Sequence, residues 1–131
     1  MGTLDEGFEN LTLFQTGKSL PRPIILLEPE SGNYWKTWLG WVKTVLVKNK
    51  FISPDDTSLF QLKNSAKEAC RAIHDFYRVY HSLRYFGGLT ILRFIRPIPL
   101  KVIDRLNDEF NDILPTRGID LDRITLRIWI R

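Results

Sequence analysis

The order of apolar patterns in the first two thirds of the chain is the feature that most restricts its fold. Residues 4–16 and 35–46 carry apolar side chains at helical spacing, and "IILLE", residues 24–28, forms a short continuous apolar run between them. Such a run is typical of a strand covered on both faces. A second strand candidate, "SLFQL", precedes a third helical pattern. This helix-strand-helix-strand-helix order predicts parallel strands joined by right-handed crossovers.

Local signals place the ends of these predicted helices. Gly17 is a stop signal for the first helix, and Asn33 is the expected N-cap of the second. Pro54 follows Ser53 at a plausible first helical position, which predicts one short turn before the second strand. The third helix begins at an S-x-x-E capping box, Ser65 to Glu68. Its expected apolar face consists of Ala66, Ala69, Cys70, Ile73, Tyr77 and Tyr80.

The pattern changes after Leu83. The segments "LTILRFI" and "RITLRIWI" alternate apolar and polar residues by two, and they enclose a helical pattern. That helix has Leu100, Ile103, Leu106, Phe110 and Ile113 on one side. We therefore predict an α/β fold in residues 1–86, followed by a small α+β extension, strand-helix-strand, in residues 87–131. The expected boundary lies near "FGG", residues 86–88.

Composition limits the class of protein. The 131 residues fit one domain, and 44% hydrophobic and 12% aromatic residues exclude a disordered chain. No run approaches the ~20 apolar residues of a membrane span, and no signal-peptide pattern is present, so we expect a cytoplasmic protein with no membrane partner. The single cysteine, Cys70, excludes an internal disulfide and is expected to be inert and buried. A net charge of +4, spread along the chain, is compatible with phosphate-bearing ligands.

The start of the first predicted helix carries the most specific chemical pattern. The first N–H groups of a helix have no internal partner, and the helix dipole is positive there, so Gly2 and Thr3 could hold phosphate oxygens. Glu6 lies one turn further on, where its carboxylate could face a sugar attached to that phosphate. The same residues, Thr3 to Glu6, also form a T-x-x-E capping box that needs no ligand. The spacing alone leaves both interpretations open.

Other chemistries find little support in the sequence. His74 and His81 are not at a metal-binding interval, so we expect no metal site. The three tryptophans between Trp35 and Trp41 could stack on bases, but their helical spacing favours packing. Five arginines, Arg71, Arg78, Arg84, Arg93 and Arg96, straddle a helix and a strand, and most are expected on solvated faces. We therefore expect no nucleic-acid partner.

Several segments taken together resemble one known family. They are "GTLDEGFENLTLFQTGK", "PIILLE", "YWKTWLGWV", "FISPDDTSLFQL", "FYRVYHSLRYFGG", "LNDEFNDIL" and "LDRITLRIWIR". The chain resembles the LONELY GUY (LOG) family, long described as possible lysine decarboxylases, and most closely its longer bacterial members. The resemblance implies a Rossmann-like nucleotide-binding fold, a homo-oligomer, and hydrolysis of the N-glycosidic bond of nucleoside 5′-monophosphates such as AMP. It implies no cofactor or metal.

The family motif P-G-G-x-G-T-x-x-E assigns expected roles to three residues. Gly2 and Thr3 match its G-T and are expected to bind phosphate, and Glu6 matches its catalytic glutamate. The preceding part of the motif, the family's arginine motif and the first strands are expected upstream of Met1. We therefore expect a C-terminal portion of a phosphoribohydrolase that is inactive alone, or alternatively a non-catalytic nucleotide-binding or protein-interaction fragment. Lysine decarboxylation would need an electron sink that nothing in the sequence suggests.

Overall fold

The computed structural model describes residues 2–86, 89–112, 114, 118–122 and 127–130. The chain divides into two compact units, residues 1–74 and 75–131, which are described separately below. We call them unit 1 and unit 2. The expected boundary after Phe86 falls inside a hairpin of unit 2, because strands on either side of residues 87–88 pair with each other.

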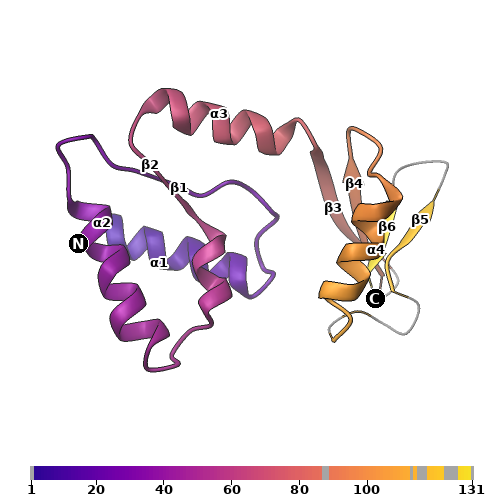
Figure 1. Cartoon of the computed structure of the whole chain (residues 1–131), viewed down its shortest axis with the longest axis horizontal. Helices are drawn as coiled ribbons and strands as arrows, with labels where there is room; N and C mark the ends of the chain where they lie inside the picture. Colours follow the sequence, from indigo (N-terminus) through magenta and orange to yellow (C-terminus); the bar gives the residue numbers. More distant parts are fainter. Residues whose placement is uncertain (1, 87–88, 113, 115–117, 123–126, 131) are drawn as a thin grey trace. The chain divides into compact units, whose positions relative to one another are not determined.

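Unit 1 contains the predicted alternation of helices and strands. Helix α1 spans Gly2–Gln15, strand β1 Ile25–Leu27, helix α2 Tyr34–Trp41 and strand β2 Gln61–Lys63 (Figure 1). The strands are parallel, with Leu26 opposite Leu62. The Glu28 N–H donates to the Lys63 carbonyl (2.8 Å) and extends this pairing by one step. The expected α/β fold with a parallel sheet flanked by helices is confirmed.

Two helical segments of unit 1 depart from regular α-helix. Helix α2 continues directly into a π-helical stretch, η1 (Val42–Val47), which closes at Lys50 with φ +62°. A 3₁₀ helix, η2 (Pro54–Leu59), begins at the predicted cap: the Ser53 hydroxyl accepts from the Asp55 N–H, and the Asp56 carboxylate accepts from the Ser53 N–H. Because η2 runs on to Leu59, the second strand begins later than its sequence pattern indicates.

The core of unit 1 lies between α1, the α2–η1 helix and β2. Leu26, Val42 and Phe60 are buried, and Val42 is only 2% exposed. Trp38 packs edge to face against Phe60 and Phe8, with ring centroids 5.3 and 5.8 Å away. Packing is therefore the role of Trp38, whereas Trp41 is exposed. Leu27 is 45% exposed, so this small sheet is covered less completely than its apolar sequence predicts.

Helix α3 (Ala66–Tyr77) begins with the predicted cap but differs in two respects. The Ser65 hydroxyl accepts from the Glu68 N–H (3.2 Å), and the Glu68 carboxylate reaches back to the Asn64 N–H (3.0 Å). The predicted inclusion of Tyr80 in the helix is wrong, because Tyr80 opens the next strand. The expectation that Cys70 is buried is also wrong: its thiol is free and exposed, since no residue of α3 is buried.

Unit 2 is an antiparallel sheet with one helix. Strands β3 (Tyr80–Phe86), β4 (Leu89–Phe94), β5 (Asp120–Asp122) and β6 (Arg127–Ile130) lie in the order β3-β4-β6-β5, and helix α4 spans Leu100–Glu109. Figure 1 shows α4 in front of this sheet. The predicted strand-helix-strand extension is present, with β3 and β5 added to its sheet. Of the predicted segments, residues 113 and 123–126 lie outside the described residues.

The core of unit 2 forms between α4 and one face of the sheet. Ile103 and Ile119 are buried, and Leu92, Phe94, Ile98, Leu106 and Leu114 pack around them. The Asn107 amide oxygen accepts from the Ile119 N–H (2.6 Å) and so ties α4 to the segment before β5. Gly118 has φ +63°, and a Cβ there would lie 2.7 Å from that same amide oxygen. Glycine is therefore required at this turn.

Candidate functional site at the start of helix α1

The structure places Gly2, Thr3 and Glu6 together on the first turn and a half of α1. All three residues are exposed. Thr3 and Glu6 are three residues apart in the helix, so their side chains are neighbours on its surface. A Cβ built on Gly2 would meet no atom within 4 Å, which leaves the approach to the first N–H groups open. The three predicted site residues therefore share one accessible helix end.

The competing interpretation, a capping box, does not describe these residues. Helix α1 begins at Gly2, so Thr3 lies inside the helix and not at its N-cap. Among the described residues, the side chains of Thr3 and Glu6 make no hydrogen bond or ion pair, with each other or elsewhere. The Glu6 backbone carbonyl accepts from the Asn10 side-chain amide (2.8 Å), which leaves the Glu6 carboxylate uninvolved. Both polar side chains keep their hydrogen-bonding capacity for another partner.

The end of β1 presents a second carboxylate, Glu28, at the start of another helix. Figure 1 shows α1 and β1 running in opposite directions, so the start of α1 and the end of β1 lie toward the same end of unit 1. Glu28 is 1% exposed. Its carboxylate accepts hydrogen bonds from the N–H groups of Trp35 and Lys36, the latter at 3.2 Å. Glu28 therefore satisfies the first turn of α2 from inside the protein.

This arrangement corrects one expectation about α2. Asn33 occupies the N-cap position, as predicted, but its side chain makes no capping hydrogen bond because Glu28 has taken the available N–H groups. Gly32 makes room for the carboxylate: a Cβ there would overlap with Glu28 Oε1. The N-terminus of α2 is thus filled by an internal anion, whereas the exposed side chains at the start of α1 have no such partner among the described residues. The start of α2 is therefore occupied from inside the protein, whereas Gly2 and Thr3 at the start of α1 are exposed.

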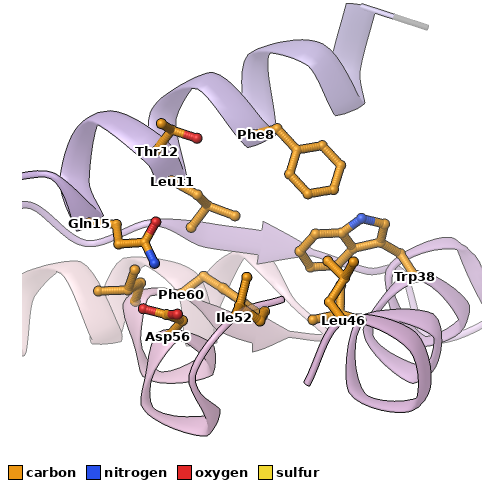
Figure 2. A pocket seen from close by; sticks show the side chains of 11 residues that line it. Phe8, Leu11, Thr12, Gln15, Trp38, Leu46, Ile52, Asp56 and Phe60 are labelled. Carbon is orange, nitrogen blue, oxygen red and sulfur yellow. The ribbon is translucent and has the colours of Figure 1, made fainter. Parts of the chain in front are cut away.

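A small cavity lies deeper in unit 1, between α1, the α2–η1 helix and η2. It has a volume of about 90 Å³, and Figure 2 shows Phe8, Leu11, Trp38 and Phe60 around it. Thr12, Gln15 and Asp56 supply its polar edge. The Asp56 carboxylate is already bonded to the Ser53 N–H, and the remaining lining is apolar. This cavity is a gap in the core, and neither Thr3 nor Glu6 lines it.

The part of the chain that the structure describes contains neither a metal-binding cluster nor a membrane-spanning helix. No group of three or more His, Cys, Asp or Glu side chains is arranged to hold a metal ion there. None of the described helices is long and apolar enough to cross a membrane. His81 bonds through Nδ1 to the Ser82 hydroxyl (2.9 Å) in β3, and His74 lies on α3.

Comparison with known protein families gives a match, and the matched residues include this site. Residues 1–73 match the family described as "Possible lysine decarboxylase", and this match spans α1, β1, α2, β2 and most of α3. The chain belongs to this family. The family contains the LOG proteins, so the resemblance seen in the sequence is confirmed. A comparison with curated proteins gives no match. The family assignment therefore rests on unit 1, and unit 2 lies outside the matched residues.

Sequence reasoning missed the role of Glu28. The available signal was a carboxylate directly after an apolar strand run and a glycine four residues later, before a helical pattern. The Asn33 N-cap signal masked it, because local propensity favours asparagine at that position whereas only the tertiary structure brings Glu28 to the same N–H groups. Gly2, Thr3 and Glu6 needed no tertiary information, since their spacing within one helix fixes their relation.

Proposed function

We propose that unit 1 carries part of the active site of a nucleoside 5′-monophosphate phosphoribohydrolase, an enzyme that splits AMP-like nucleotides into free base and ribose 5-phosphate. The observation that carries the proposal is the exposed start of α1 in a chain of the LOG-containing family. There, two side chains at helical neighbour positions, Thr3 and Glu6, keep their polar groups free of described partners. The proposal includes a cytoplasmic setting, which the sequence composition predicts.

Each residue has a defined task in this proposal. The N–H groups at the start of α1 and the Thr3 hydroxyl hold the 5′-phosphate, and Gly2 lets the phosphate approach the backbone closely. The Glu6 carboxylate, one turn along, faces the ribose. As the bond between base and sugar breaks, positive charge develops on the ribose, and a fixed carboxylate nearby stabilises it. Water then completes the hydrolysis.

We further propose that this site is completed by other parallel strands and that the chain alone is inactive. Two strands form the parallel sheet of unit 1 among the described residues, and Leu27 at the end of β1 is 45% exposed. Parallel sheets are normally covered on both faces, so a further segment or a second copy is needed to cover this one. A homo-oligomer is one way to supply it. Each charge-assisted hydrogen bond to phosphate contributes about 1.5 to 3 kcal/mol, so further strands that supply such bonds would strengthen nucleotide binding.

The test compares two glutamates of α1 in a longer protein of this family that contains this chain and hydrolyses AMP. Glu6→Gln removes the negative charge with little change in shape. We expect it to lower kcat by at least a hundredfold, equal to about 2.7 kcal/mol of transition-state stabilisation, with an unchanged melting temperature. Glu9→Gln, an exposed glutamate on the same helix, is the matched control and should keep full activity. Full activity of Glu6→Gln would contradict the proposal.

The alternative function is a non-catalytic interaction fragment, favoured by the incompletely covered sheet. Incubation of the chain alone with AMP, followed by chromatographic detection of adenine, separates the possibilities. We expect no adenine from the chain alone and release of adenine only from the longer protein. Turnover by the chain alone would show that no further strands are required. Absence of turnover from every longer protein would leave the interaction role.

A further inference from the structure

Tyr34 is an exposed aromatic residue at the end of unit 1 where α1 begins. It opens helix α2 and is 53% exposed. The carboxylate of Glu28, which directly follows β1, accepts a hydrogen bond from the N–H group of Trp35, so the first turn of α2 is fixed at the carboxyl end of β1. Figure 1 shows that α1 also begins at this end of unit 1. In open α/β sheets, ligands bind outside the carboxyl ends of the strands, which is where Tyr34 lies.

Helices α1 and α2 are also direct neighbours. The rings of Phe8 and Trp38 pack edge to face, with their centroids 5.8 Å apart. Thr3 and Glu6 precede Phe8 on α1 by less than two turns, and Tyr34 precedes Trp38 on α2 by about one turn. Two adjacent helices that begin at the same end of unit 1 therefore present, at that end, the proposed phosphate-binding residues and an exposed aromatic ring.

A chain of aromatic contacts holds the Tyr34 ring in place. Tyr34 packs edge to face against Trp35, with centroids 4.9 Å apart, and Trp35 packs in the same way against Trp38, at 5.7 Å. Trp38 in turn contacts the buried ring of Phe60 at 5.3 Å. The exposed ring is thus connected to the core of unit 1. A side chain that is already fixed loses little conformational entropy when a ligand binds to it.

Tyr34 is the aromatic residue of α2 that is best placed to contact a nucleotide. Trp35 and Trp38 are partly buried, and Trp41 is the last residue of α2, at the other end of the helix. Exposed aromatic side chains stack on bases because every base has a flat ring. We infer that Tyr34 stacks on the base of the nucleotide whose phosphate is held at the start of α1. This inference rests on the proposed function and adds the residue that recognises the base.

The test compares binding of AMP with binding of ribose 5-phosphate, which has the same sugar and phosphate but no base. Isothermal titration calorimetry measures both dissociation constants on the longer protein of the Glu6 experiment, with Glu6→Gln as the background that stops turnover. Tyr34→Ala should weaken AMP binding roughly 5- to 150-fold, the range for one lost base stack, and should leave ribose 5-phosphate binding unchanged. If the background still hydrolyses AMP, KM for AMP and the inhibition constant of ribose 5-phosphate give the same comparison.

Two further substitutions separate stacking from other effects. Tyr34→Phe keeps the ring and should bind AMP as tightly as the parent, whereas Tyr34→Leu keeps an apolar side chain without a flat ring and should weaken AMP binding as alanine does. The matched control is Phe51→Ala, because Phe51 is a 72% exposed aromatic residue beyond the far end of the α2–η1 helix. It should change neither dissociation constant. Circular dichroism checks that each variant is folded.

Three results would overturn the inference. They are a parent protein that does not bind AMP, unchanged AMP binding in Tyr34→Ala, and equal losses for AMP and ribose 5-phosphate, which would show that Tyr34 only supports the fold. If Glu6→Gln abolished hydrolysis while Tyr34→Ala bound AMP normally, the stacking inference alone would fail. If Tyr34→Ala weakened AMP binding selectively in a protein without hydrolase activity, the inference would stand and the proposed function would fail.

Discussion

Replacement of Glu28 should reveal how strongly a single buried carboxylate holds unit 1 together. The side chain is 1% exposed and accepts from the N–H groups of Trp35 and Lys36. In Glu28→Ala these two donors lose their acceptor in a place that water does not reach. A hydrogen bond to a charged group contributes about 1.5 to 3 kcal/mol, and an orphaned buried donor costs a similar amount. We expect the free energy of unfolding of unit 1 to fall by about 3 to 5 kcal/mol.

Urea denaturation followed by tryptophan fluorescence measures this loss. Three of the four tryptophans lie in or beside α2, and a Trp129→Phe background removes the remaining one, so the signal reports unit 1 alone. At a slope of about 1 kcal/mol/M for a unit of this size, the unfolding midpoint should fall by about 3 M or more. Glu28→Gln keeps one acceptor oxygen without the charge, so it should lose about half as much.

Two comparisons make the Glu28 result interpretable. Glu30→Ala removes an exposed carboxylate from the same loop and should change stability by less than about 0.5 kcal/mol. Gly32→Ala should destabilise the protein because its Cβ would overlap with Glu28 Oε1, and this effect should shrink when Glu28 is already alanine. If Glu28→Ala left the midpoint within 0.5 M of the parent, the carboxylate would not be the cap of α2 and the reasoning would fail.

Two further outcomes follow from backbone geometry and titration. Lys50 adopts φ +62°, a conformation that costs a non-glycine residue about 1 kcal/mol. Lys50→Gly should therefore raise the urea midpoint of unit 1, and a lowered midpoint would contradict this reasoning. Burial raises the pKa of Tyr80 above its ordinary value of 10.0 and outweighs the opposing hydrogen bond at Leu83, so the folded state holds its proton longer than the unfolded state. The resulting stabilisation of unit 2 is complete below pH 10 and is lost as the pH rises through the higher folded pKa. Tyr80→Phe should remove this alkaline dependence in unfolding measurements, and an unchanged pH profile would count against it.

Much of unit 1 could be read from local patterns because neighbouring residues determine them. The apolar run before Glu28 became β1, and the S-x-x-E pattern at Ser65 capped α3. Gly17, with φ +69°, ends the first helix as expected. These features depend on periodicity and on capping bonds within a few residues. The π-helical stretch η1 had no such local signal, and the predicted regular helix therefore ended too late.

The candidate site also has one part that the sequence predicted and one part that only the structure shows. Gly2, Thr3 and Glu6 share a helix turn, so their relation is set by the sequence as soon as α1 forms. The sequence could not predict that the side chains of Thr3 and Glu6 make no hydrogen bond with other described residues. The T-x-x-E pattern fits a capping box, in which both side chains would bond to the backbone, equally well. Only the observed start of α1 at Gly2 places Thr3 inside the helix and removes that alternative.

By itself, the sequence determined the helix and strand types of unit 1, the parallel direction of its strands and its membership of the LOG-containing family. Periodicity, caps and motif spacing are properties of adjacent residues. The tertiary structure decided which groups distant in sequence meet: Glu28 with the start of α2, and Asn107 of α4 with Ile119 before β5. Those contacts depend on strand register and on chain reversal, which bring together groups that no local pattern connects.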